Sequence, residues 1–205
     1  MTALWTGSAP LLLASTSATR RTLLESAGLP VETRASGVDE RAVEAAVEER
    51  ALGPQNLALH LAAEKALAVS RAAPERIVLG ADQVLDRDGI ALHKPDGRET
   101  ARAQLQSLSG RSHALHSAVA LARNGELVDS FVETALLSMR PLSDAAIEAY
   151  LDAAGPEVLK SAGVYQVEGV GIHLFDRIEG DHSTILGLPL LPLLAALRRL
   201  GHLAF

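Results

Sequence analysis

The chain has 205 residues, of which 48% are hydrophobic, 21% charged and 3% aromatic, and its formal net charge is −6. This length and balance are typical of a soluble globular protein with one domain and a full aliphatic core. The negative charge argues against nucleic acid or an acidic membrane as a partner, and the absence of cysteine excludes disulfides and thiol chemistry. The N-terminal residues lack the basic region and apolar length of a signal peptide, so we expect a cytoplasmic protein.

The first predicted element is a buried strand over 11–14, followed by small hydroxyl residues and a helix that ends at Gly28. Arg20 and Arg21 fall in the first turn of this helix, where the partial positive charge of a helix N-terminus normally favours acidic residues. Backbone N–H groups, hydroxyls and guanidinium groups at one such corner form a phosphate site. The alternative, an arginine pair solvated after an ordinary capped turn, stays open from this stretch alone.

A second buried strand is predicted over 76–82, and it ends on Asp82. Between the two buried strands the sequence predicts a strand over 31–35, an acidic corner over 38–41, and a helix over 56–73 whose apolar face is Leu59, Ala62, Ala63 and Ala66, with Lys65 beside it. Open α/β sheets bind ligands at the carboxyl ends of strands, so we expect Asp82 and the corner over 15–21 to face one crevice. The alternative for Asp82 is a simple turn cap.

The second half continues with helices and strands in alternation. The predicted elements are a helix over 99–108, strands over 112–121 and 128–140, a helix capped by Ser143, a glycine-rich tract over 162–181 and a closing helix over 185–200 that buries Leu193, Leu194, Leu197 and Leu200. This order indicates an α/β fold with antiparallel strands grouped in the second half. The closing run is too short to span a bilayer.

Side chains suited to a polyphosphate and a metal ion lie near these elements. Lys65 and Lys94 add positive charges, and Asp39 and Glu40 add carboxylates. Metal-assisted attack on a phosphate needs cations to hold the polyphosphate, carboxylates to hold a divalent ion, and one carboxylate to orient or deprotonate water. Each of these residues taken singly is also explained as a solvated surface charge. The seven histidines show no metal-ligand spacing, and no Walker, dinucleotide-binding or serine-elbow motif occurs.

Several motifs, in order, resemble the Maf family of nucleoside triphosphate pyrophosphatases. They are LASTSATRRTLLESAG (13–28), VDE (38–40), LAAEKA (61–66), LGADQV (79–84), HKP (93–95), LSGRSH (108–113), AGVYQVEG (162–169) and IEGDHSTILGLPL (178–190). The resemblance covers nearly the whole chain. It implies a mixed central sheet flanked by helices, in two lobes around one cleft, and usually a homodimer. It also implies hydrolysis of a nucleoside triphosphate to the monophosphate and pyrophosphate with a divalent cation, Mg²⁺ or Mn²⁺.

The resemblance also implies roles for individual residues. Asp82 matches the catalytic base. The side chains that match phosphate-binding positions are Ser17, Arg20, Lys65 and Lys94. The carboxylates that match metal-binding positions are Glu40, Asp39 and Asp82.

Three departures from the family pattern affect what the resemblance implies. Ala18 replaces the usual proline after the second serine, and Lys160 with Ser161 replaces an Asp-Lys pair. Gln83 and Glu168 resemble the branch that acts on 7-methyl-GTP, which points to that substrate.

The sequence also allows comparison with two other functions and one purely structural alternative. The segment RRTLLESAGL resembles the end of a Nudix box, but Thr22, Ser26 and Leu13 stand where its metal-binding glutamates belong, so that mechanism is excluded. A nucleotide-binding regulator of septum formation is the alternative in a different functional class. A structural α/β domain leaves the arginine corner unexplained.

Overall fold

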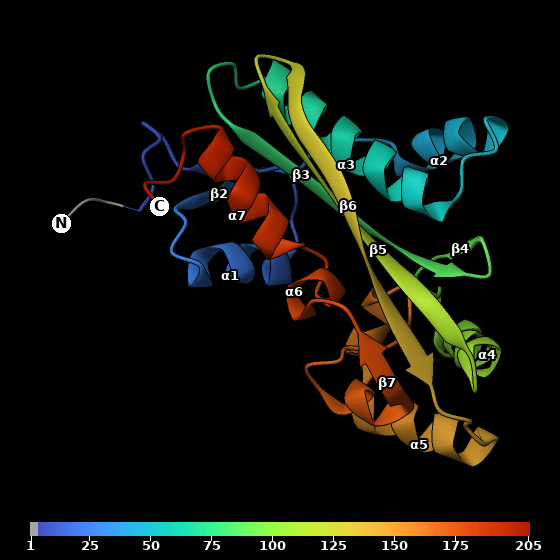
Figure 1. The fold of residues 1–205 in the computed structure, drawn as a ribbon. Helices are drawn as coiled ribbons and strands as arrows, with labels where there is room; N and C mark the ends of the chain where they lie inside the picture. Colours follow the sequence, from blue (N-terminus) through green and yellow to red (C-terminus); the bar gives the residue numbers. More distant parts are fainter. Residues whose placement is uncertain (1–3) are drawn as a thin grey trace.

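The computed structural model describes residues 4–205 and folds them into a seven-stranded mixed sheet flanked by helices (Figure 1). The first half contains β1 (Leu11–Leu13), α1 (Ala18–Ser26), β2 (Val31–Thr33), α2 (Glu40–Glu49), α3 (Pro54–Arg71), β3 (Val78–Arg87) and β4 (Ile90–Leu92). The second half contains α4 (Arg98–Leu108), β5 (Ser112–Arg123), β6 (Glu126–Met139), α5 (Asp144–Ala154), the 3-10 helices η1 (Pro156–Lys160) and η2 (Val170–Leu174), β7 (Phe175–Glu179), α6 (His182–Ile185) and α7 (Leu190–Arg199).

The strand order is β2-β1-β3-β5-β6-β7, and β4 pairs with the far part of β3. β1 pairs in parallel with β2 and β3, whereas every other pair is antiparallel. The predicted α/β class is therefore confirmed, and the antiparallel strands lie in the second half except for the β3–β4 pair. Among residues 4–205, no helix combines the length and the apolar character needed to cross a membrane.

The prediction that the second buried strand ends at Asp82 is wrong, because β3 continues to Arg87. Antiparallel pairing with β5 carries the strand on, since Asp86 is still opposite Ala114. The opposite edge of β3 behaves differently. β1 pairs with β3 only as far as Leu79, and β4 begins to pair with it at Leu85. Within the described residues, the β3 edge that includes Asp82 therefore has no strand partner between these two points.

Helix α3 lies directly on β3. A Cβ atom at Gly80 would stand 2.1 Å from the carbonyl oxygen of Ala62, so only glycine allows this close approach. The buried residues of α3 include Leu57, Ala58, Leu61, Ala62, Lys65, Ala66 and Val69. The predicted face is thus half correct: Ala62 and Ala66 are buried, Leu59 and Ala63 are only partly so, and Lys65 lies within the buried face. The sequence of α3 is apolar on most sides, so its periodicity does not define one face.

Figure 1 shows α1 and α7 at one end of the long β5–β6 hairpin and α4, α5 and β7 at the other. Separate apolar cores underlie the two ends. Two further predictions are corrected. The acidic corner over 38–41 leads into helix α2, which Asp39 caps. The closing helix is divided by Gly187, whose φ of +92° is unfavourable for other residues, and Leu200 is exposed because α7 stops at Arg199.

Candidate functional site

The corner between β1 and α1 gathers hydroxyl groups around the helix N-terminus. Ser17 is the N-cap of α1, and its Oγ accepts a hydrogen bond from the backbone N–H of Arg20 at 3.3 Å. The backbone N–H of Ser17 in turn donates to Ser15 Oγ at 3.2 Å. The first turn of α1 contains no acidic residue. This helix end therefore has its partial positive charge uncompensated by a carboxylate of its own turn.

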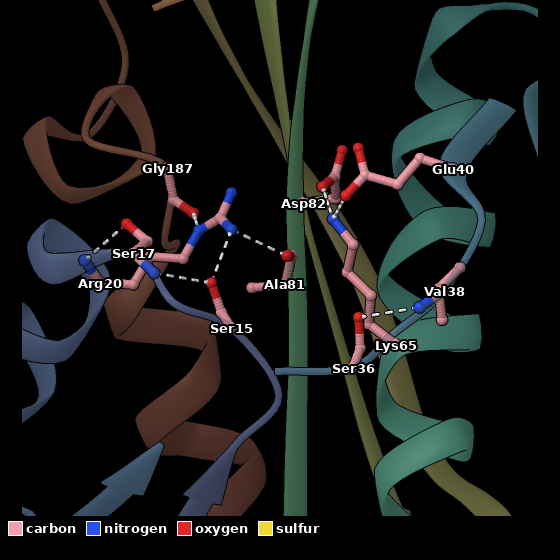
Figure 2. A network of polar contacts seen from close by, with 10 residues as sticks. All are labelled: Ser15, Ser17, Arg20, Ser36, Val38, Glu40, Lys65, Ala81, Asp82 and Gly187. Atoms are coloured by element: carbon pink, nitrogen blue, oxygen red, sulfur yellow. Dashed lines mark hydrogen bonds and ion pairs between the residues drawn. The ribbon is translucent and has the colours of Figure 1, made fainter. Parts of the chain in front are cut away.

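The side chain of Arg20 crosses from this corner to β3, as Figure 2 shows. Its Nε donates to the carbonyl oxygen of Gly187 at 2.9 Å, and its Nη1 donates to the carbonyl oxygen of Ala81, also at 2.9 Å. Burial lowers the pKa of Arg20, and the charges of Asp82 and Glu40 act in the opposite direction. Among residues 4–205, no carboxylate forms an ion pair with Arg20. Its hydrogen-bond acceptors are neutral, so the guanidinium group keeps its capacity to bind an anion.

Asp82 lies on the other side of β3 and points toward α3 (Figure 2). Lys65 Nζ stands 2.5 Å from Asp82 Oδ1 and 2.7 Å from Glu40 Oε1, so one ammonium group bridges two carboxylates. The side chains of Lys65 and Asp82 are only 9% and 13% exposed, whereas that of Glu40 is 60% exposed. The Asp82 carboxylate is therefore fixed in position, and the Glu40 carboxylate reaches the same ammonium group from the start of α2.

The structure brings together four of the sequence-predicted residues other than Asp82 itself. Ala81, which accepts from Arg20, directly precedes Asp82, so the arginine corner and the carboxylates flank the same short piece of β3. Ser17 and Arg20 come from the start of α1, Glu40 from the start of α2 and Lys65 from α3. They meet where β3 has no strand partner on its β1 side.

Two predicted residues lie outside this network. Asp39 caps α2, its Oδ1 accepting from the backbone N–H of Ala42 at 3.1 Å. Lys94 is exposed on the loop between β4 and α4, and among the described residues it makes no ion pair. Its neighbour His93 contacts Glu44 of α2 at 3.0 Å, which ties this loop to the helix that carries Glu40.

Carboxylate oxygens are the protein ligands that Mg²⁺ and Mn²⁺ prefer, and Mg²⁺ commonly uses one or two of them together with substrate phosphates. Oxygens of Asp82 and Glu40 converge on one point, which the ammonium group of Lys65 occupies. The donor set fits a hard divalent cation. No group of three or more histidine, aspartate or glutamate side chains able to hold a metal occurs in residues 4–205.

The sequence does not predict the buried polar contacts of Gln83, which it marks only as a departure from the family pattern and a pointer to 7-methyl-GTP. Its Nε2 donates to Ser117 Oγ and to the carbonyl oxygens of Thr184 and Ile185. The motif over 178–190, which contains these two carbonyl groups, was recognised without a role. Gly187 within this motif is the sequence signal that the backbone approaches another group closely at this point.

His113 is a buried core residue on β5, hydrogen bonded to the Tyr165 hydroxyl at 2.6 Å. Burial lowers the pKa of His113 to about 4. The unfolded chain binds this proton more readily, so stability is present above pH 6.5 and falls as the pH drops toward 4. We expect His113 to reduce the free energy of unfolding by about 3 kcal/mol between pH 7 and pH 4.

Urea unfolding at several pH values measures this effect. In a His113→Phe variant this part of the pH dependence should be missing, whereas replacement of the exposed His173 by Gln should leave it in place. Identical pH slopes in the parent protein and His113→Phe would contradict the assignment.

The sequence matches the family model described as Maf-like protein over residues 10–200. It is 56% identical, over 196 residues, to the nucleoside triphosphate pyrophosphatase of Nitrobacter winogradskyi, covering 96% of each chain. It is 52% identical over 202 residues to the protein of the same name in Rhodopseudomonas palustris strain BisB18, covering 98% of this chain and 99% of the relative. It is 49% identical over 191 residues to the 7-methyl-GTP pyrophosphatase of Rhizobium meliloti, covering 93% of this chain and 96% of the relative.

Proposed function

Because the chain belongs to the Maf family, we propose that it is a nucleoside triphosphate pyrophosphatase, with its active site at the unpartnered edge of β3. The observation that carries this proposal is the arrangement of Arg20 and Asp82. A guanidinium group bonded only to neutral acceptors lies on one side of two consecutive β3 residues, and a fixed carboxylate lies on the other. One group suits a phosphate anion, and the other suits a water molecule that attacks it.

We assign the polyphosphate to the corner between β1 and α1. The N-terminus of α1, the Ser17 hydroxyl and the Arg20 guanidinium supply donors from one side. Lys65 of α3 and Lys94 of the loop between β4 and α4 supply further positive charge. These groups form a local positive region on a protein whose net charge is −6. Such a region binds a small polyanion, whereas the overall negative charge disfavours nucleic acid.

Asp82 acts as the general base in this proposal. Its Oδ1 is bonded to Lys65, and its second oxygen makes no hydrogen bond among the described residues, so that oxygen can accept a proton from water. Water attacks the α-phosphorus, the bond to the oxygen bridging the α- and β-phosphorus breaks, and pyrophosphate leaves. The positive groups stabilise the charge that develops on the leaving group.

A divalent cation completes the proposal. Asp82 and Glu40 would hold it, with Asp39 as the weaker candidate because its carboxylate already caps α2. The chemistry that Mg²⁺ or Mn²⁺ supplies when bound is neutralisation of phosphate charge. Lys65 would then give up its shared position between the two carboxylates and turn toward phosphate oxygens.

A panel of triphosphates tests the activity and its range. We expect release of pyrophosphate rather than orthophosphate, dependent on added Mg²⁺ or Mn²⁺, with 7-methyl-GTP among the substrates because Gln83 and Glu168 match the sequence pattern of that branch. The matched measurement is monophosphate formation by chromatography, which should equal pyrophosphate formation. Stepwise orthophosphate release would contradict the proposal. Tight triphosphate binding without any hydrolysis would instead favour a nucleotide-binding regulator of septum formation.

The remaining parts of the proposal concern the state of the protein in the cell. We propose a homodimer, which the resemblance to the family motifs implies, and a cytoplasmic location, since nucleoside triphosphates are made and used there.

A further inference from the structure

Polar side chains of β3 and β5 hold the carbonyl groups at the C-terminal end of α6. Ser117 Oγ donates to the carbonyl oxygen of Thr184 at 2.7 Å, and Gln83 Nε2 donates to the same oxygen at 3.0 Å. Gln83 Nε2 also lies 2.9 Å from Ser117 Oγ and 3.0 Å from the carbonyl oxygen of Ile185. Ser117 and Thr184 are almost completely buried, with 0% and 2% exposure. These contacts are therefore shielded from competing water.

The same carbonyl oxygen connects this buried group to Arg20. The backbone N–H of Gly187 donates to the Thr184 carbonyl oxygen at 3.0 Å. The carbonyl oxygen of Gly187 then accepts from Arg20 Nε at 2.9 Å. Gly187 is thus hydrogen bonded to Thr184 through its N–H and to Arg20 through its carbonyl group, so the position of Thr184 affects that of Arg20.

The backbone conformation of Gly187 suits these two hydrogen bonds. Its φ of +92° lies in the region that disfavours residues with a Cβ atom. A Cβ atom there would lie 3.6 Å from Arg20 Nε and 3.7 Å from Gln83 Oε1, so both side chains rest against this glycine. Glycine adopts this conformation without strain, and Gln83 and Ser117 hold the Thr184 carbonyl group to which the Gly187 N–H is bonded.

We propose that Ser117 and Gln83 are positioning residues that orient the Arg20 guanidinium toward the triphosphate through the Thr184 and Gly187 backbone. This inference rests on the proposed function. It assigns Gln83 a role independent of the nucleobase, since its amide nitrogen is already engaged by two carbonyl groups and a hydroxyl. Loss of either side chain should loosen Gly187 and misplace Arg20 while leaving Asp82 and Lys65 unchanged.

Ser117→Ala is the most direct test, because a fully buried serine does not touch the nucleotide. We expect kcat/KM to fall roughly tenfold, the size expected for a small misplacement of a binding group. The fall should be the same for every triphosphate that the parent enzyme hydrolyses. Gln83→Met, which keeps the side-chain length and removes the amide, should give the same uniform loss.

Ser70→Ala is the matched control. Ser70 is also 0% exposed, and its Oγ accepts one hydrogen bond, from the backbone N–H of Gly125 in the turn between β5 and β6. The Ser70→Ala variant should lose stability to a similar degree as Ser117→Ala and keep the kcat/KM of the parent. A purely structural effect of removing a buried hydroxyl would appear in both variants.

A double-mutant cycle with Arg20→Lys separates positioning from a general effect. If Ser117 acts through Arg20, Ser117→Ala should cost much less in the Arg20→Lys background than in the parent. The ¹⁵N NMR signal of Arg20 Nε should also shift in Ser117→Ala without any nucleotide present. Additive losses with an unchanged Nε signal, or a loss that depends on the nucleobase, would overturn the inference. Absence of activity in the parent enzyme would instead overturn the proposed function.

Discussion

Replacing Asp82 by Asn is expected to lower kcat by roughly 10²–10⁴-fold, the range for removal of a general base. The substitution keeps the shape of the side chain and a hydrogen-bond acceptor for Lys65, but an amide does not take the proton of the attacking water. Glu40 remains to pair with Lys65 at 2.7 Å, so the fold should be retained. Pyrophosphate release under saturating triphosphate measures kcat, and thermal unfolding checks the fold.

Asp129→Asn is the matched control for this prediction. Asp129 also lies on a long strand of the sheet and pairs with a basic side chain, Arg199, at 2.6 Å. It has no part in the proposed site, so its kcat should equal that of the parent. A near-normal kcat in Asp82→Asn would remove Asp82 from the mechanism.

Replacing Arg20 by Ala should reduce kcat/KM by roughly 10²–10³-fold, the effect of removing a donor from a charge-stabilising site. Stability should fall by about 1–3 kcal/mol, because the carbonyl groups of Gly187 and Ala81 lose their donor. Arg20→Lys should recover the charge but not the two fixed hydrogen bonds, so its activity should be intermediate. Steady-state kinetics and urea unfolding measure the two effects.

The neighbouring arginine is the natural control. Arg21 lies in the same helical turn, but it is exposed and pairs with Glu25 at 2.7 Å. Arg21→Ala should therefore leave kcat/KM and stability close to those of the parent. An equal loss in both variants would show that the corner acts only through its overall charge. Complete unfolding of Arg20→Ala would make its role structural.

Most of the strands and helices follow from local patterns in the sequence. The short apolar run at β1 and the hydroxyl-capped start of α1 are visible in a few consecutive residues. Asp82 was selected for an incorrect local reason, since it does not end its strand. β1 does not reach this part of the β3 edge, because it pairs with β3 only as far as Leu79, and the length of a neighbouring strand cannot be deduced from the sequence of β3. Lys65 was expected beside the buried face of α3, but pairing with two carboxylates allows the ammonium group to be buried.

The contacts least accessible to sequence reasoning are those between distant backbone groups. The carbonyl group of Gly187 is 167 residues from Arg20 along the chain, and backbone groups carry no sequence signature. The resemblance to family motifs identified the segment that contains Gly187 but not its task. Only the folded structure shows that this segment connects Gln83 and Ser117 to Arg20.

The central claim is that water attacks the α-phosphorus of a nucleoside triphosphate held between Arg20 and Asp82. Hydrolysis in ¹⁸O-labelled water followed by mass spectrometry of both products tests it most directly. We expect one ¹⁸O atom in the nucleoside monophosphate and none in the pyrophosphate. The labelled monophosphate should form at a strongly reduced rate in both Asp82→Asn and Arg20→Ala. Label in the pyrophosphate, or labelled monophosphate formed at the parent rate by either variant, would contradict it.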